Sequence, residues 1–349
     1  MAEPVAWPEE LADGWDALAA RTGSAFSTWS FHRTWWEHYG QGRRREVSAV
    51  RRDDGSLAAI LPLYRWRERP LQVLRFVGDG VGDELGPICA PGDRALAAAA
   101  LRESLSGRLL VGERLSGEGW DAAVGGSLVL REGSPLVHLG QASWDEFLAM
   151  RSANFRQQLR RRERALFREH EARFRLTSSP AELDRDLSSL VELHRRRWHD
   201  RTSFLRHERF HRVFAARALA EGRLRLWHLE LAGTPVAAWL GFRVGRVESF
   251  YQAGRDPSWD HASVGLVLLA HSIRAALEDG MDEYRFLRGA EPYKYRFADE
   301  DPGLETILVA PGAPWAAAGL AGGARLARSA RGRIRRLRAV SLRARPPNE

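Results

Sequence analysis

The order of strand-like and helical segments in the second half of the chain most constrains the fold. Three strand-like runs follow one another directly, and the first two are joined by Ala-Gly-Thr-Pro, a hairpin turn. A helical pattern and two further strands follow, and a strand and two amphipathic helices precede them. The expected segments are, in order, 173–177, 181–200, 207–221, 224–231, 236–244, 247–253, 264–279, 283–287 and 304–309. This order predicts a mixed α/β fold with a largely antiparallel sheet, and it lacks the repeated βαβ alternation of a Rossmann fold.

The first half of the chain shows a similar mixture of helices and short strands. Helices are expected at 8–20, 30–39 and 94–104, and strands at 46–51, 57–64, 71–77, 108–115 and 127–131. Between them, VGDGVGDELGPICAPGD has a glycine spacing that matches no phosphate loop or dinucleotide fingerprint, so we interpret it as a turn-rich connection. Because 349 residues suit two domains, we expect an N-terminal domain at 1–150, a C-terminal domain at 151–312 and a tail at 313–349.

Composition limits the class of protein further. Hydrophobic residues make up 44% and charged residues 28%, which is typical of a globular protein with a core. No run reaches the roughly 18 apolar residues of a membrane span, and the N-terminus lacks the pattern of a signal peptide. Cys89 is the only cysteine, so no intrachain disulfide can form. The eleven histidines show no metal-ligand spacing, and we expect a cytoplasmic protein without a metal.

The positive charge is concentrated at the C-terminal end. Residues 313–349 hold nine arginines and one acid, so this segment carries a net charge of +8, equal to that of the whole chain. Such a segment attracts phosphates of lipid or RNA, and an anionic membrane surface at the inner face of the membrane is one candidate partner. A solvated, poorly ordered tail is the equally favoured alternative.

Lysine usage singles out one position. The chain has 53 basic residues, and only Lys294 is a lysine. An ammonium is a compact charge on a flexible stem with a movable pKa, which a guanidinium is not. Because arginine fills every other basic position apart from histidine, the single lysine indicates a specific role for Lys294.

Four segments of this chain resemble the CelD-like and FemAB-like bacterial acyltransferases of the GNAT superfamily. They are FSTWSFHRTWW near the start, NFRQQLRRRERAL at 154–166, SVGLVLLAHSIRAALEDG at 263–280 and YRFLRGAEPYKYRF at 284–297. The last is the most specific, because Fem-type transferases carry a similar aromatic-Lys-x-x-Phe signature. The resemblance covers roughly residues 20–310 and implies two tandem GNAT-like domains, each a mixed, largely antiparallel sheet flanked by helices.

The resemblance also implies where a donor would bind. GNAT enzymes hold the pyrophosphate of acyl-CoA on backbone N–H groups at a helix N-terminus. In this chain that position is Ser263, Val264 and Gly265. Asp260 stands where the family pattern has a cation or an amide, and an aspartate repels a pyrophosphate. An ordinary helix N-capped by Ser263 is the competing interpretation.

The candidate catalytic residues surround Lys294. By the resemblance, its ammonium would stabilise the developing charge or anchor an acidic acceptor; the alternative is a surface lysine in an ion pair with Glu291 or Asp299. Glu291 is also a candidate general base, and Tyr251 and Tyr293 are candidate proton donors to a leaving thiolate. Glu248 lies on the strand that faces the thioester in GNAT folds, and strand alternation places it on one face with Phe250 and Gln252.

The candidate substrate-binding residues are mostly basic. Asn154, Arg156 and Arg160 open the arginine-rich helix, and the two arginines share a face that suits a phosphorylated or acidic substrate. A solvated arginine face explains them equally well. Trp198 is expected in the core or in a groove wall, and Arg288 near the Lys294 motif is a further candidate.

Three functions remain open at this point. The first is an acyltransferase that moves an acyl group from acyl-CoA or an acyl carrier protein to an amine or hydroxyl of a sugar, peptide or envelope precursor. The second is a Fem-like aminoacyl transferase with aminoacyl-tRNA as donor, for which binding falls steeply with salt. The third is a non-catalytic GNAT-derived binding module at the membrane surface. The specific motif around Lys294 favours an enzyme.

Overall fold

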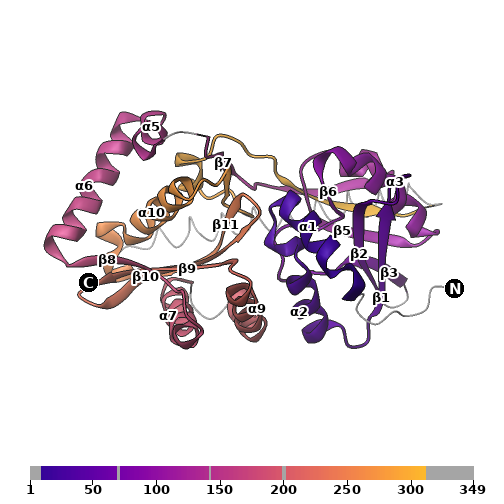
Figure 1. The fold of residues 1–349 in the computed structure, drawn as a ribbon, viewed down its shortest axis with the longest axis horizontal. Helices are drawn as coiled ribbons and strands as arrows, with labels where there is room; N and C mark the ends of the chain where they lie inside the picture. The colour runs from indigo at the N-terminus through magenta and orange to yellow at the C-terminus, as the bar shows by residue number, and fades with distance from the viewer. Residues whose placement is uncertain (1–8, 69–70, 141–142, 199–201, 312–349) are drawn as a thin grey trace, which may run out of the picture.

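The computed structural model describes residues 9–68, 71–140, 143–198 and 202–311, and the arginine-rich segment lies outside them. Two mixed sheets with helices packed on their faces make up the fold, which confirms the predicted fold class (Figure 1). One half of the molecule is built mainly from residues up to 132, and the other mainly from residues after 143. We refer to them as the N-terminal half and the C-terminal half.

The sheet of the N-terminal half has the order β1-β2-β3-β5-β13-β6, with β4 paired to β2. All neighbours are antiparallel except β3 and β5, which are parallel. Its strands are β1 (Arg44–Arg51), β2 (Leu57–Glu68), β3 (Leu71–Phe76), β4 (Ile88–Cys89), β5 (Leu109–Ser116), β6 (Ser127–Glu132) and β13 (Leu304–Val309).

The sheet of the C-terminal half has the order β7-β12-β11-β10-β9-β8, and only β11 and β12 are parallel. Its strands are β7 (Leu136–His138), β8 (Ala172–Leu176), β9 (Leu224–Leu231), β10 (Thr234–Val244), β11 (Val247–Arg255) and β12 (Glu283–Arg285). Both sheets therefore follow one plan, in which an antiparallel run leads through a crossover helix to a parallel strand. The crossover helices are α3 (Arg94–Leu105) and α10 (Val264–Glu278).

Each half completes its sheet with a strand from the other part of the chain. β13 comes from the C-terminal end but lies between β5 and β6, and β7 precedes residue 150 but pairs with β12 (Figure 1). The structure thus corrects the predicted boundary at 150/151 in two places, because 136–138 and 304–309 were assigned to the wrong half. Strand pairing over such sequence separations leaves no local signal.

Helices cover both faces of the C-terminal sheet. In Figure 1, α7 and α9 lie on one face and α10 and α6 on the other. Along β10, Ala238, Leu240 and Phe242 face the first layer and Ala237 and Trp239 the second, as strand alternation requires. The remaining helices are α1 (Ala12–Thr22), α2 (Trp29–Tyr39), α4 (Trp120–Val124), α5 (Trp144–Ala149), α6 (Ala153–Glu169), α7 (Pro180–Trp198), α8 (Ser203–Arg206) and α9 (Glu208–Ala220).

Side-chain caps explain where several helices begin. The hydroxyl of Thr28 accepts a hydrogen bond from the backbone N–H of Phe31 at the start of α2, and Ser152 does the same for Phe155 in α6. Ser263 precedes α10 but has a left-handed backbone with φ +56° and makes no side-chain cap. Ser263 therefore occupies the predicted N-cap position, but its hydroxyl does not cap the helix.

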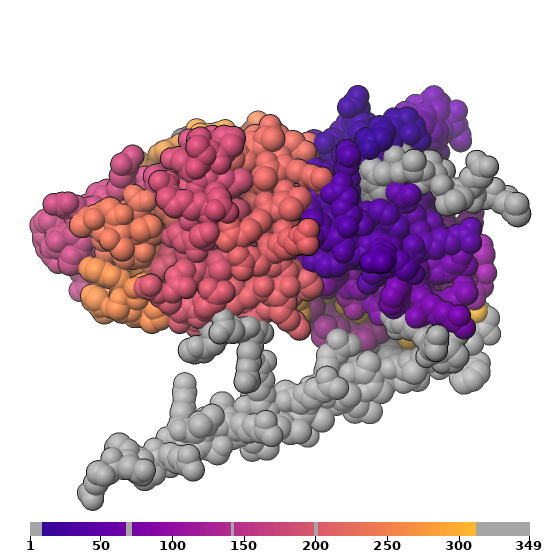
Figure 2. Space-filling view, turned by 90° about the horizontal axis from the view of Figure 1, so that it is seen from below, coloured from indigo at the N-terminus to yellow at the C-terminus, as the bar shows by residue number. Residues whose placement is uncertain are grey.

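The two halves share one hydrophobic core across their junction. Phe31 of α2 contacts the rings of Phe210 and Phe214 of α9 at centroid distances of 5.7 and 5.3 Å. Figure 2 shows the two halves in broad contact. Because burying aromatic rings dominates such contacts, the junction holds loops of the N-terminal half in a fixed place beside the C-terminal sheet.

No helix in the described part of the chain is long and apolar enough to cross a membrane.

Candidate active site

An apolar groove of about 340 Å³ opens where α10 begins, between that helix and strands β10 and β11. Its walls are mostly small and aromatic side chains, and its charged groups are at the rim. It is lined by Arg197, Ala237, Ala238, Trp239, Phe250, Ala253, Gly254, Arg255, Asp260, Ser263, Gly265, Leu266, Leu268, Leu269 and Tyr293. We call it the apolar groove.

A second, more polar cavity of about 430 Å³ lies between α7, β11 and the turn that carries Lys294. Two of its residues, Asp83 and Glu132, come from the N-terminal half. The others are His194, Arg197, Trp198, Thr202, Ser203, Phe204, Phe250, Tyr251, Gln252, Ala253, Arg288, Gly289, Glu291, Tyr293 and Lys294. We call it the polar cavity; it brings together six of the predicted site residues, namely Trp198, Tyr251, Arg288, Glu291, Tyr293 and Lys294.

The two cavities adjoin one another. Arg197, Phe250, Ala253 and Tyr293 line both of them. A molecule in the apolar groove can therefore present one end to a molecule in the polar cavity at Tyr293. This is the geometry that a group transfer between two substrates requires.

Lys294 is buried, with 3% of its surface exposed, and its ammonium is fully engaged. Its Nζ donates to the carbonyls of Arg288 at 2.8 Å and Gly289 at 3.2 Å, and it pairs with a carboxylate oxygen of Glu291 at 2.9 Å. Burial lowers the pKa of the ammonium, and Glu291 opposes that effect. The expected ion pair with Glu291 is present, but Lys294 is not a surface residue.

The ammonium holds the turn that forms one wall of the polar cavity. Gly289 in this turn has φ +117°, and a side chain there would collide with the carboxylate of Glu291. The turn needs a compact cation with donors in several directions, which an ammonium provides and a planar guanidinium does not. This explains physically why a lysine stands here among 52 arginines.

Tyr293 lies at the meeting point of the two cavities. Burial raises the pKa of its hydroxyl to about 12, and the negative charge of Glu291 adds to the effect. The hydroxyl therefore remains protonated near neutral pH and can serve as a proton donor. Tyr251 also lines the polar cavity, but its hydroxyl donates to the carbonyl of Val81 at 2.6 Å, so it connects the two halves.

A β-bulge in β11 interrupts the strict alternation of faces that the sequence predicts for this strand. Leu240 pairs with Gln252 and Gly241 with Phe250, so that Tyr251 is the extra residue. As a result Phe250 and Ala253 pack into the same core, although strict alternation places them on opposite faces. The bulge turns four successive residues, 250–253, toward the polar cavity.

Glu248 does not lie in either cavity. Its side chain is fully buried and pairs with Arg243 at 2.7 Å and Arg225 at 3.5 Å. Burial raises the pKa of this carboxyl, and the two guanidiniums oppose the rise. The structure therefore places the predicted catalytic residue Glu248 in an internal charge cluster of the sheet.

The predicted donor cradle lies at the rim of the apolar groove. Ser263 and Gly265 line the groove, whereas the side chain of Val264 is fully buried in the core. Asp260 is held by the guanidinium of Arg255 through two contacts of 2.5 and 3.1 Å, which lowers the pKa of its carboxyl. Its charge is thus compensated, and the expected repulsion of a pyrophosphate is reduced.

The predicted substrate residues of α6 are engaged within the fold. Arg156 donates to the carbonyls of Ala149 and Arg151, and Arg160 pairs with Asp145 at 2.8 Å. The side-chain carbonyl of Asn154 accepts a hydrogen bond from Gln158. None of Asn154, Arg156 and Arg160 lines either cavity, so the structure separates them from Trp198 and Arg288.

Several cavity residues were missed by the sequence reasoning, and two of them, Arg197 and Asp83, carry charges for which no ion pair is found among the described residues. Arg197 lines both cavities, and no carboxylate within the described residues lies at ion-pair distance from it; the nearby rim charges are Arg255 and Asp260. Asp83 lines the polar cavity from the glycine-rich loop, and burial raises the pKa of its carboxyl to about 6. Arg197 could have been found from the sequence, because it directly precedes the predicted residue Trp198 in the segment HRRRW. No local pattern marks Asp83.

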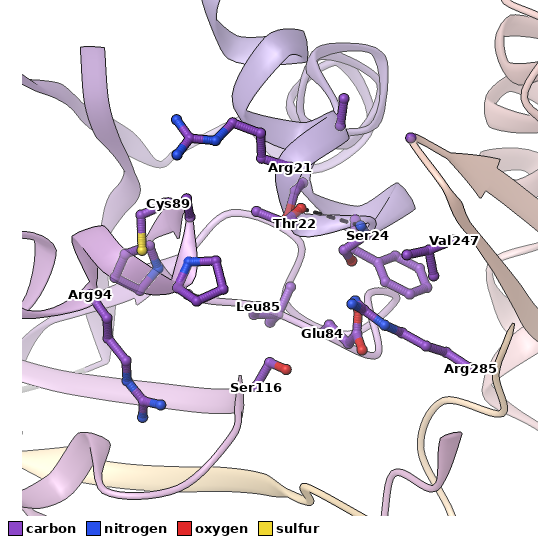
Figure 3. A pocket seen from close by; sticks show the side chains of 18 of the residues that line it. Arg21, Thr22, Ser24, Glu84, Leu85, Cys89, Arg94, Ser116, Val247 and Arg285 are labelled. Atoms are coloured by element: carbon purple, nitrogen blue, oxygen red, sulfur yellow. Dashed lines mark hydrogen bonds and ion pairs between the residues drawn. The ribbon is translucent and has the colours of Figure 1, made fainter. Parts of the chain in front are cut away.

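A third cavity of about 660 Å³ lies on the other side of that loop (Figure 3). Glu84 of the loop and Arg285 of β12 face one another there at 3.4 Å, and Arg285 also contacts Glu283. Arg246 pairs with Asp282 at 2.6 Å on the same wall. Its charges are largely compensated inside the protein; in the polar cavity Lys294 and Arg288 are paired as well, and the described residues give no ion pair only to Arg197 and Asp83.

No group of three or more His, Cys, Asp or Glu side chains in the described part of the chain is placed to hold a metal ion.

Comparison with known proteins agrees with this architecture. Residues 153–295 match the family model of an acetyltransferase (GNAT) domain. No curated protein matches the sequence significantly.

Solved structures show the same fold at low sequence identity. FemX has a TM-score of 0.62 and 10% identity, and the match covers 87% of this chain and 97% of that one. The C-terminal domain of a protein assigned as a lysylphosphatidylglycerol synthetase from Agrobacterium fabrum has a TM-score of 0.58, 14% identity and coverages of 89% and 94%. L-PGS from Bacillus licheniformis has a TM-score of 0.54 and 13% identity, and the match covers 93% of this chain and 97% of that one. The family match covers the strands, helices and turn that form the apolar groove and most of the polar cavity, so this part of the chain is similar to a GNAT acetyltransferase domain, and the solved structures share its fold.

Proposed function

We propose that this protein transfers an acyl group from a thioester donor in the apolar groove to an amine or hydroxyl in the polar cavity. The observation that carries the proposal is that the two cavities meet at Tyr293, Arg197, Phe250 and Ala253. An acyl-CoA or an acyl carrier protein would supply the donor. The acceptor would be a sugar, a peptide or an envelope precursor, since the polar cavity offers charged groups of both signs.

The walls of the apolar groove suit a thioester arm. Trp239, Phe250 and Leu269 provide apolar surface along the arm, and apolar contact stabilises it by about 25 cal/mol per Å² of buried area. At the rim, Arg197 and the backbone at Ser263 and Gly265 at the head of α10 attract the anionic end of such a donor.

The chemistry at the meeting point follows from the side chains there. Attack on the thioester carbon breaks the C–S bond, and the hydroxyl of Tyr293 donates its proton to the sulfur that leaves. Lys294 acts indirectly, as a positioning residue. Its ammonium fixes the turn of residues 288–291, and this turn determines the position of Tyr293.

A second candidate is an aminoacyl transferase that uses aminoacyl-tRNA. The fold shared with FemX, with L-PGS and with the domain of the protein assigned as a lysylphosphatidylglycerol synthetase supports it. The arginine-rich face of α6 supports it as well, because Arg161 and Arg162 line a hollow beside residues 261–262, close to the head of α10.

Calorimetric titration of acetyl-CoA and of a long-chain acyl-CoA into the purified protein tests the donor. We expect saturable binding, about tenfold weaker binding in Arg197→Gln, and unchanged binding in Arg196→Gln. Arg196 is the matched control, because it is the adjacent residue of α7 but is exposed and paired with Glu192 and Asp256.

Absence of binding to both CoA esters would exclude the acyl-CoA donor. Binding of aminoacyl-tRNA that weakens steeply between 50 and 200 mM salt, on the order of a hundredfold or more, would then favour the second candidate.

A further inference from the structure

The reaction proposed above leaves one proton without an acceptor. An amine or hydroxyl that attacks a thioester must lose a proton to a base within reach. The carboxylates in the polar cavity are Asp83, Glu132 and Glu291. Glu291 is paired with Lys294 at 2.9 Å and Glu132 with Arg288 at 2.9 Å. Asp83 is the one cavity carboxylate for which the described residues provide neither an ion pair nor a hydrogen bond.

The loop that carries Asp83 is fixed on both sides of it. Before Asp83, the carbonyl of Val81 accepts from the hydroxyl of Tyr251, and the carbonyl of Gly82 accepts from the guanidinium of Arg114. After Asp83, Glu84 pairs with Arg285 at 3.4 Å across the junction, as Figure 3 shows. The backbone N–H of Leu85 donates to the carbonyl of Arg114 at 2.9 Å.

Glycine is required where the loop turns. The Gly82 backbone lies so close to the side chains of Leu85 and Phe31 that an added Cβ would stand 2.7 and 3.2 Å from them. Gly82 and Val81 both donate to the carbonyl of Gly78, at 2.8 and 3.2 Å, which closes the turn. The loop is therefore a rigid support for a single carboxylate without a partner, rather than a passive connection.

We propose that Asp83, supplied by the N-terminal half, is the general base that takes the proton of the acceptor in the polar cavity. This proposal rests on the proposed acyl transfer. As the neutral amine or hydroxyl attacks, a C–N or C–O bond forms, its proton passes to Asp83, the C–S bond breaks and the sulfur takes the proton of Tyr293. Tyr293 then regains a proton and Asp83 loses one, so that thioester and acceptor give acylated acceptor and thiol.

The surroundings suit this role. Burial raises the pKa of the Asp83 carboxyl to about 6, so it is ionised near neutral pH but remains a better base than an exposed aspartate. The cations around it limit the rise. The charged and titratable groups that face it are Arg114 of β5, Arg288 and Lys294 of the turn, Glu84 of its own loop and Tyr251 of β11.

The test measures thiol release from acetyl-CoA and a long-chain acyl-CoA in the presence of a panel of amino sugars and small amines. Wild-type protein is compared with Asp83→Asn, Asp83→Glu and the control Asp53→Asn. Asp53 is an exposed aspartate of the β1–β2 turn and lines neither cavity.

We expect Asp83→Asn to lower kcat by a factor of about 100 or more with little change in KM. The fall of the wild-type rate below about pH 6 should disappear in this variant. Asp83→Glu should retain part of the rate, and Asp53→Asn all of it.

An Asp83→Asn variant that keeps a rate within threefold of wild type, with the same acidic limb, would overturn the assignment of the base while leaving the acyl transfer intact. Wild-type protein that releases no thiol with any donor and acceptor would instead overturn the proposed function, and the base with it. A thermal melt of each variant shows whether it is folded, so a rate loss from unfolding is recognised.

Discussion

The two halves share a sheet plan but differ at the head of their crossover helices. In the C-terminal half, α10 follows β11 and begins at the apolar groove, beside Arg197. In the N-terminal half, α3 follows β3, and the residue before it, Asp93, is held by Arg52 through two contacts of 2.6 and 3.1 Å. Arg94, the first residue of α3, lies over the ring of Trp120. The residue directly before the crossover helix is therefore an ion-paired aspartate in the N-terminal half and an uncharged serine in the C-terminal half.

This difference indicates a division of labour. A carboxylate at the start of α3 offsets the positive end of the helix, so this helix does not attract an anionic donor. The N-terminal half contributes instead the loop between β3 and α3, which reaches the polar cavity with Asp83. Under the proposed acyl transfer, the C-terminal half would hold the donor and the N-terminal half would supply the base.

The largest expected effect concerns the buried charge cluster of the C-terminal sheet. Glu248→Ala leaves Arg225 and Arg243 without their shared carboxylate, which should cost about 3–5 kcal/mol in the free energy of unfolding. Urea denaturation measures the loss. Calorimetry on the folded variant at low temperature should show unchanged CoA-ester binding; a stable variant that no longer binds would place Glu248 in the site after all.

Lys294 should show the next largest effect. In Lys294→Met the carbonyls of Arg288 and Gly289 lose a charged donor, and we expect a loss of about 2–3 kcal/mol in urea denaturation. Lys294→Arg should not restore stability, because the guanidinium does not fit the turn. An arginine variant as stable as wild type would contradict this account of the lone lysine.

Substitution of Asp83 should change the free energy of unfolding in the opposite direction and stabilise the protein. The carboxyl pKa of Asp83 is raised from 3.8 to about 6, so its contribution to stability is fully present below pH 4 and is lost as the pH rises through 6. Asp83→Asn should therefore raise the free energy of unfolding at pH 7.5 by about 1–2 kcal/mol, a figure discounted for the solvent that reaches the cavity.

The gain should vanish near pH 4, which a series of urea denaturations across pH can follow. A loss of stability at pH 7.5 would show that Asp83 holds the fold, and would remove the contrast between this loop and the charge-compensated start of α3.

The smallest effect is expected on α6. Arg160 forms an exposed ion pair with Asp145, so Arg160→Ala should change the free energy of unfolding by about 0.5 kcal/mol or less. Binding of acetyl-CoA should be unaffected. A tenfold loss of binding would return α6 to the substrate site, as the sequence had predicted.

Much of the fold follows from local sequence patterns. Hydrophobic periodicity located most strands of both sheets and the helices α2, α3, α6, α7, α9 and α10 to within a few residues, but it did not locate the short strands β4 and β7. The exchange of β7 and β13 between the sheets was not predictable, because both strands are short and their pairing depends on distant segments. The short helices α4, α5 and α8 also lacked a periodic signal.

The residues of the polar cavity also fall into those that a local pattern identified and those that it did not. Arg288, Glu291, Tyr293 and Lys294 come together because they belong to one short turn, so a local motif found them. Tyr251 was found, but the face it occupies was not, since a single extra residue in β11 reverses the alternation. Asp83 reaches the cavity only because the halves dock through Phe31 and α9, which no pattern along the chain reports.

The most direct test of the division between the halves is a crystal structure of the protein with CoA. We expect the pantetheine arm in the apolar groove, its sulfur beside Tyr293 and Phe250, its phosphates at the head of α10, and no density for CoA at the head of α3. CoA bound instead in the cavity of Figure 3, beside Arg94 and Arg285, would contradict the account.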